Sequence, residues 1–227
     1  MVGLFIALTI AFTTGALLKA TREDWDSTGV ILSVVFFFLG GIFVMGDLSS
    51  EANTLFVATV GQLSALVFLL VAFVPARSYL LRCTLGNVFL GLGGGLVALF
   101  ASNLWLTLIE QVGIEHEQQT LLAILNDSSA LWITLFAVLV APVVEEFVFR
   151  GGLFDWINGL RGHQTAIYCT AILFGCVHLD SITSVPPLIF FGVILAWLRL
   201  YTKSLIVPII AHITNNGIVM LGALSAV

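Results

Sequence analysis

The feature that most constrains this chain is a series of long apolar runs with very little charge inside them. Of 227 residues, 59% are hydrophobic and only 9% are charged, whereas soluble domains carry about a quarter charged residues. A helix that crosses the hydrocarbon core of a bilayer needs roughly 20 apolar residues. The pattern therefore predicts an all-α integral membrane protein in the lipid bilayer. It leaves no polar stretch long enough for a separate soluble domain, and no nucleic-acid partner is expected.

Hydropathy along the chain predicts a polytopic transmembrane helical bundle of about eight spans, formed by residues 1–227 as a single domain. The predicted spans are 2–18, 29–46, 54–74, 85–109, 130–160, 164–179, 186–200 and 204–225. The first run has no basic segment before it, so we interpret it as a span and not as a signal peptide. Residues 115–128 are expected to form an interfacial connector.

The positions of the basic residues support this count of spans. All eight Lys and Arg residues fall at the first, third, fifth and seventh connections, if Arg150 is counted with the helix that leads to the fifth. The pairs are Lys19 and Arg22, Arg77 and Arg82, Arg150 and Arg161, and Arg199 and Lys203. Under the positive-inside rule these connections are cytoplasmic. Both termini are therefore predicted to lie on the outer side. The membrane is expected to be the cell membrane, that is, a plasma or inner membrane.

Ionisable side chains interrupt the apolar runs of the C-terminal half. A charge near the bilayer centre costs at least about 2.5–3.5 kcal/mol on insertion scales, so such residues indicate a functional site. They occur in three stretches, which read Ala141-Pro-Val-Val-Glu-Glu-Phe-Val-Phe-Arg150, Phe174-Gly-Cys-Val-His178 and His212-Ile-Thr-Asn-Asn216. We therefore expect the functional core to cover about residues 130–225.

The two adjacent glutamates receive different roles from helical spacing. Glu146 and Arg150 are four residues apart, so they share a helix face and are predicted to form an ion pair. Glu145 is rotated by about 100° from Glu146 and has no such cation. A carboxylate in an apolar site without a cation on its own helix is suited to proton transfer. Glu145 is therefore the predicted general base that activates water.

The two histidines and an asparagine complete the predicted site. His178 is expected to orient or share the water, because a neutral imidazole both donates and accepts hydrogen bonds. His212 and Asn216 share a helix face and can donate to a developing oxyanion, whereas Asn215 points about 100° away. Glu145, His178 and His212 lie about 24, 22 and 14 Å from the cytoplasmic ends of their helices at 1.5 Å per residue. They are predicted to converge in a site recessed in the membrane.

Two prolines precede site residues in their helices. Pro142 lies three residues before Glu145, and Pro208 lies four before His212. Each removes a backbone hydrogen bond and can kink its helix. The kinks either open the bundle near the site or have no functional role.

The motifs EExxxR followed by Gly, FxxxH and HxxxN, in this order, resemble those of the CPBP family of membrane proteases, also called the CAAX protease and bacteriocin-processing or ABI family. The approach to the last motif, with Phe191-Gly192, Ser204-Leu205 and Pro208, is also similar. The resemblance covers about residues 140–220, and residues 1–130 carry no comparable signature. It implies a core of eight membrane helices and proteolysis within the bilayer, as in the type II CAAX prenyl endopeptidases.

The resemblance also implies roles for individual residues. In the CAAX-processing members, a Glu and a His activate water while a His and an Asn stabilise the oxyanion. The matching positions are Glu145, His178, His212 and Asn216. The supporting positions are Glu146, Arg150 and Phe174. These roles agree with those inferred from helical spacing.

The resemblance leaves two possibilities for a metal. Family members are often labelled metalloproteases, and Glu145, His178 and His212 can in principle bind zinc together with a water. However, the sequence has no HExxH pair, and a Glu/His arrangement can activate water directly. We therefore expect a metal-independent enzyme without a cofactor, with zinc as the alternative.

The sequence as a whole predicts an intramembrane endopeptidase. Its expected substrate is a membrane-anchored or lipid-modified protein or peptide, of which a prenylated CAAX-type protein is one example. One alternative is a non-catalytic immunity or scaffold protein of the same fold, which would not need all four site residues. The other is a small proton-coupled transporter with buried carboxylates as the relay, but no inverted repeat is evident.

Overall fold

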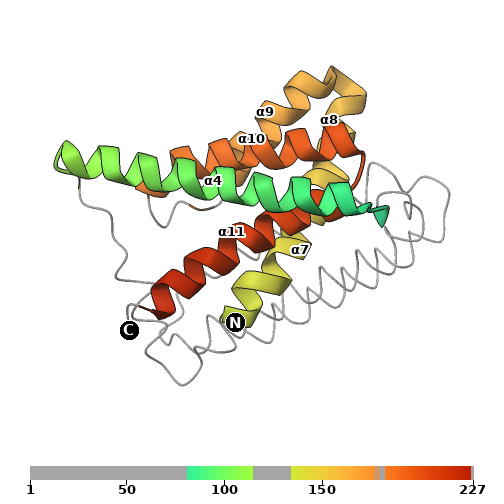
Figure 1. The fold of residues 1–227 in the computed structure, drawn as a ribbon. Coiled ribbons are helices and arrows are strands. Elements are labelled where there is room, and N and C mark those ends of the chain that lie inside the picture. Colours follow the sequence, from blue (N-terminus) through green and yellow to red (C-terminus); the bar gives the residue numbers. More distant parts are fainter. Residues whose placement is uncertain (1–80, 115–133, 177, 179–181, 226–227) are drawn as a thin grey trace, which may run out of the picture.

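The computed structural model describes residues 81–114, 134–176, 178 and 182–225, in which every assigned element is a helix (Figure 1). The all-α prediction is thus confirmed for this part of the chain. The predicted spans 2–18, 29–46 and 54–74 and the connector 115–128 lie outside the described residues. The count of about eight spans therefore stays a prediction.

The five predicted spans of the C-terminal part all correspond to observed helices. They are α4 (Leu85–Gln111), a helical run over residues 136–161, α9 (His163–Cys176), α10 (Val185–Thr202) and α11 (Ile206–Leu224). A short 3-10 turn, η5 (Ile182–Ser184), precedes α10. The clearest difference concerns α9, which ends at Cys176. His178 therefore follows the helix. The predicted span 164–179 had placed it inside the helix.

The fifth predicted span is a run of helical segments with alternating geometry. It consists of η3 (Phe136–Val140), α7 (Ala141–Glu146), η4 (Phe147–Leu153) and α8 (Phe154–Arg161). The two η segments are π-helical, so a backbone amide donates to the carbonyl five residues earlier, as Ala141 does to Phe136 and Phe154 to Phe149. Such turns are rare and often mark functional sites. The short α7, which carries both glutamates, lies between them.

Small residues allow the helices to pack closely. α4 lies along α10 and α11 in Figure 1 and packs against both. A Cβ atom at Gly95 of α4 would lie 2.5 Å from the carbonyl oxygen of Ala211 in α11. A Cβ atom at Gly192 of α10 would lie 2.8 Å from the Cα of Ala171 in α9. Gly95 and Gly192 thus permit a close helix approach, which is the usual role of small residues in membrane bundles.

The described helices support the membrane assignment. Among the described residues, three helical stretches are long and apolar enough to cross a membrane, namely Leu85–Gln111, Ile182–Thr202 and Ile206–Leu224. The sides on which the two termini lie stay a prediction. Arg199, which was counted with the seventh connection, lies in the last turn of α10 and is buried.

Candidate functional site

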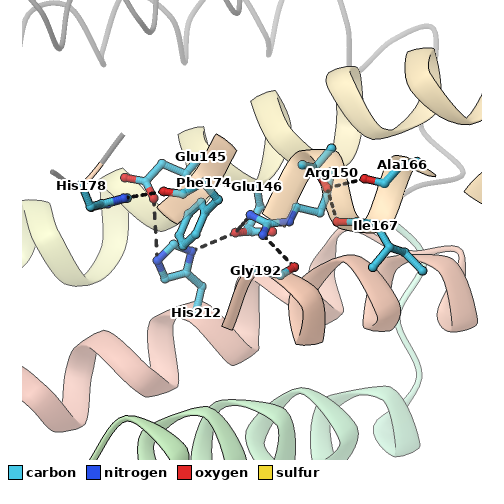
Figure 2. Close-up of polar contacts among 10 residues, drawn as sticks. Glu145, Glu146, Arg150, Ala166, Ile167, Phe174, His178, Gly192 and His212 are labelled. Carbon is cyan, nitrogen blue, oxygen red and sulfur yellow. Dashed lines mark hydrogen bonds and ion pairs between the residues drawn. The ribbon is translucent and has the colours of Figure 1, made fainter. Parts of the chain in front are cut away.

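The two glutamates at the end of α7 are buried in the centre of the described helices. Glu145 is 7% exposed, and Glu146 and Arg150 are fully buried. Arg150 Nη1 donates to Glu146 Oε1 at 2.9 Å, and its Nη2 donates to the carbonyl of Gly192 in α10 at 3.1 Å (Figure 2). The predicted ion pair between Glu146 and Arg150 is confirmed. It also attaches the fifth span to α10.

His212 lies between the two glutamates. Its Nδ1 atom is 2.9 Å from Glu146 Oε1, and its Nε2 atom is 3.8 Å from Glu145 Oε2 (Figure 2). Because the Glu146 carboxylate accepts from Arg150, we assign a proton to Nδ1, which donates to the same oxygen. The Nε2 atom then faces Glu145. Helical spacing predicted that His212 would approach Glu145, but it did not predict the bond to Glu146.

His178 is held by the end of α9. Its backbone amide donates to Gly175 at 3.2 Å, and its Nδ1 atom lies 2.8 Å from the carbonyl oxygen of Phe174. A carbonyl oxygen only accepts, so we assign the proton of a neutral imidazole to Nδ1. The half-buried ring therefore keeps Nε2 as a proton acceptor.

Aromatic rings surround the two imidazoles. The fully buried Phe174 ring lies 5.0 Å from the His178 ring and 5.6 Å from the His212 ring between centroids. The Arg150 guanidinium carbon lies 4.7 Å from the centre of the same ring, within the range of a cation–π contact. Phe191 packs edge-to-face on His212 at 5.2 Å. Phe174, predicted only as a supporting residue, thus contacts groups from all three motifs.

Asn216 faces the fifth span, as does His212. Its Nδ2 atom donates to the carbonyl of Ala137 in η3 at 3.0 Å, and its Oδ1 atom accepts from Asn215 at 3.2 Å. The structure thus joins Asn216 to the fifth span but shows no hydrogen bond, among the described residues, between Asn216 and the glutamates. Asn215, expected outside the site, contacts the amide of Asn216.

Several buried polar atoms of this cluster have no hydrogen-bond partner among the described residues. They include the Oε2 atoms of Glu145 and Glu146 and the Nε atom of Arg150. Leaving a buried acceptor unsatisfied costs about 1–3 kcal/mol or more. For Glu145, the unsatisfied oxygen is the one that faces His212. This carboxylate is therefore available to accept a proton.

Comparison with known proteins finds a family profile that matches the part of the chain with these motifs. The sequence profile described as "Type II CAAX prenyl endopeptidase Rce1-like" matches residues 127–218. This range contains every predicted site residue. The comparisons confirm the resemblance to the CPBP family.

Two curated relatives have names that agree with the CPBP match. The membrane-embedded CAAX protease MroQ of Staphylococcus aureus (strain USA300) is 32% identical over 92 residues, which are 38% of this chain and 37% of the relative. The putative membrane peptidase YdiL of Bacillus subtilis (strain 168) is 27% identical over 146 residues, 62% of this chain and 58% of the relative. The matches thus cover less than two thirds of either relative. No solved structure matches the chain significantly.

The candidate site can be compared with the ligand set of a zinc enzyme. Among the described residues, which include Glu145, His178 and His212, no three His, Cys, Asp or Glu side chains are grouped so that they could hold a metal ion. The Nδ1 atoms of both histidines are engaged with protein oxygens. These bonds leave Nε2 of each ring as the nitrogen that could reach a ligand, as in metal-bound histidines whose other ring nitrogen donates to a protein oxygen. Whether the site uses a metal stays a prediction.

A partly buried ion pair near these motifs was not predicted. Arg199 of α10 donates through Nη2 to both carboxylate oxygens of Asp155 in α8, at 3.0 and 3.1 Å. Its Nε atom donates to the backbone carbonyl of Arg150 at 3.2 Å. The sequence did contain a signal for this pair, because Asp155 and Arg199 are oppositely charged residues within two predicted spans. Sequence reasoning assigned Arg199 to membrane orientation alone.

Proposed function

We propose that this chain is an intramembrane endopeptidase in which Glu145 is the general base. One observation carries the proposal most directly. The buried Glu145 carboxylate has an unsatisfied oxygen 3.8 Å from Nε2 of His212, whose ring is fixed by Glu146. Arg150 neutralises the neighbouring Glu146 and leaves Glu145 without a bonded cation. A base of this kind can take a proton from a water molecule.

The proposed reaction is hydrolysis of a peptide bond. Glu145 accepts a proton from water, and Nε2 of His178 accepts the water's hydrogen bond and orients its oxygen. That oxygen attacks the carbonyl carbon, the carbon–nitrogen bond then breaks, and the proton passes from Glu145 to the leaving amine. The products are a new carboxyl group and a new amino group, so no other reactant is needed.

The oxyanion of the intermediate is assigned to His212 and Asn216. The proton that Glu145 takes from water is shared with Nε2 of His212, 3.8 Å away, so the ring donates through Nε2 to the oxyanion while Nδ1 still serves Glu146. Asn216 donates through the second hydrogen of its amide nitrogen, since the first is bonded to Ala137. Each such donor typically contributes about 2.7–4 kcal/mol to the stability of the transition state. The aromatic surroundings lower the local dielectric constant and strengthen these interactions.

The names of the matching profile and relatives support the assignment of a substrate class. The matching profile is that of CAAX prenyl endopeptidases, and one relative is named a CAAX protease. We therefore assign a membrane-anchored or lipid-modified protein or peptide as substrate, with a prenylated CAAX-type protein as the first candidate. The protein acts in the cell membrane with both termini outside, and its reaction needs no cofactor.

Cleavage by purified protein in lipid nanodiscs tests the proposal. A farnesylated CAAX peptide and the same peptide without the lipid serve as substrates, and products are identified by mass spectrometry. Glu145→Gln should lower kcat by about 100-fold or more, as loss of a general base does. The matched control is Glu110→Gln, which changes an exposed glutamate of α4. Full activity of the Glu145→Gln protein would contradict the assignment.

The same assay decides between the remaining alternatives. A chelator should leave the rate unchanged, whereas a loss that zinc restores would establish the metalloprotease. A folded wild-type protein that cleaves neither peptide, nor a wider set of membrane-anchored peptides, would favour the immunity or scaffold protein. Proton-coupled uptake into liposomes that Glu145→Gln abolishes would favour the transporter.

A further inference from the structure

The π-helical turn before α7 leaves one carbonyl without its helical donor. The amide of Ala141 donates to the carbonyl of Phe136, five residues earlier. In the same register, residue 142 would donate to the carbonyl of Ala137. Residue 142 is proline, which has no amide hydrogen. Ala137 therefore has a carbonyl that its own helix does not satisfy, and an unpaired backbone carbonyl inside a helix bundle is costly unless another donor reaches it.

The amide of Asn216 supplies that donor. Its Nδ2 atom lies 3.0 Å from the Ala137 carbonyl oxygen, and its Oδ1 atom accepts from Asn215 at 3.2 Å. The Ala137 carbonyl can only accept, and the Asn215 amide nitrogen donates. The two contacts therefore agree on which atom of the Asn216 amide is nitrogen and which is oxygen. One of the two Nδ2 hydrogens is used by Ala137, and the other stays available to an acceptor.

We propose that Pro142 is a positioning residue for Asn216. Pro142 withholds a backbone amide, so the Ala137 carbonyl binds Asn216 and holds its side chain in one orientation. This inference rests on the proposed function for its catalytic consequence, in which the second hydrogen serves the oxyanion. The link between Pro142 and Asn216 does not depend on that function. A simple kink would instead act on Glu145, which lies three residues further along α7.

A double-mutant cycle in stability tests the link without any substrate. The full chain is purified in detergent as wild type, Pro142→Ala, Asn216→Ala and the double variant, and Tm is measured for each. Asn216→Ala should lower Tm in the wild-type background. It should change Tm little in the Pro142→Ala background, because the backbone amide that this substitution restores then satisfies the Ala137 carbonyl. An equal decrease in both backgrounds would overturn the proposal.

A second variant controls for the smaller side chain in Pro142→Ala, which could itself change Tm. Pro142→Val restores the amide, has a side chain of similar size and matches the following residues Val143 and Val144. It should reproduce the loss of coupling seen with Pro142→Ala. If neither variant folds, the proposal is overturned, because it requires that residue 142 can donate to Ala137 within the helix.

The catalytic consequence is tested by the same cycle in peptide cleavage. Asn216→Ala should lower kcat by about 100-fold. Pro142→Ala should lower kcat by about tenfold, as expected for a misplaced catalytic group, and should leave KM unchanged. The double variant should be no slower than Asn216→Ala alone, because a positioning residue acts only through its target. Multiplied effects would overturn the proposal and assign Pro142 to Glu145 instead.

Pro187 provides the matched control. It is also buried, but it lies in the first turn of α10, and the carbonyl four residues earlier, that of Thr183, is bonded to Trp105 and not to Asn216. Pro187→Ala should therefore combine additively with Asn216→Ala in both cycles, and coupling of equal size would overturn the specific role of Pro142. If the wild type cleaves no peptide, the proposed function fails. The stability cycle then still decides whether Pro142 positions Asn216.

Discussion

The Nδ1 atom of His212 lies 2.9 Å from Oε1 of Glu146, across 66 positions of the sequence. The same oxygen accepts a hydrogen bond from Arg150. Glu146 thus connects the arginine of its own helix run to the histidine of α11. Glu145, one residue earlier, has no such bond and keeps an unsatisfied oxygen. The two adjacent glutamates are therefore distinguished by their contacts, one with a structural role and the other available for chemistry.

This difference predicts opposite effects of the two glutamates on stability. Glu146→Ala leaves the buried Arg150 guanidinium without its carboxylate, and breaking such a pair costs about 3–5 kcal/mol. Glu145→Gln removes a buried charge that has no bonded cation, so it should leave the free energy of unfolding unchanged or raise it. Unfolding by denaturant in detergent measures both. A comparable loss of stability in the two variants would contradict the distinction.

Much of this arrangement follows from sequence periodicity. The four-residue spacing of Glu146 and Arg150 predicts their ion pair, and that of His212 and Asn216 predicts that both face the same neighbouring helix run. These are properties of one helix and depend only on its period. The bounds of α4, α10 and α11 are also close to the predicted ones, because apolar runs have clear ends.

The contacts that sequence reasoning missed depend on the irregular parts of the fold. The π-helical turns η3 and η4 change the helical register, and nothing in a 3.6-residue pattern reveals them. The bonds from Asn216 to Ala137 and from Arg199 to Arg150 both end on carbonyls of these turns. Pairing across helices requires the three-dimensional structure.

Phe174 is predicted to support catalysis through both imidazoles. Phe174→Leu keeps an apolar side chain but removes the ring that contacts His178, His212 and the Arg150 guanidinium. The lost aromatic and cation–π contacts should cost about 1–3 kcal/mol of stability. We also expect kcat to fall by about tenfold, since small shifts of catalytic groups are costly. Phe190→Leu, on the exposed side of α10, is the control and should change neither quantity.

The ion pair between Arg199 and Asp155 is predicted to hold α10 against the C-terminal part of the fifth span. Arg199→Met keeps most of the side-chain volume and removes the bonds to Asp155 and to the Arg150 carbonyl. Charge-assisted hydrogen bonds contribute about 1.5–3 kcal/mol each, so we expect a loss of that order. Arg161→Met, at an exposed position of α8, is the control. If the two variants have equal Tm values, the ion pair between Arg199 and Asp155 makes no net contribution.

Two nearby glycines of α4 allow a test of helix packing, with Gly95 as the position tested and Gly93 as its control. A Cβ atom at Gly95 would lie 2.5 Å from the Ala211 carbonyl oxygen and 2.8 Å from the Thr214 Cβ, whereas one at Gly93 would meet nothing within 4 Å. Gly95→Ala should separate α4 from α11 and cost about 1–3 kcal/mol, as overpacking does. Gly93→Ala should be neutral or stabilising, because alanine favours the helix. Since His212 directly follows Ala211, Gly95→Ala should also lower kcat in peptide cleavage. A Gly95→Ala protein with wild-type Tm and kcat would show that α4 does not fix the position of α11.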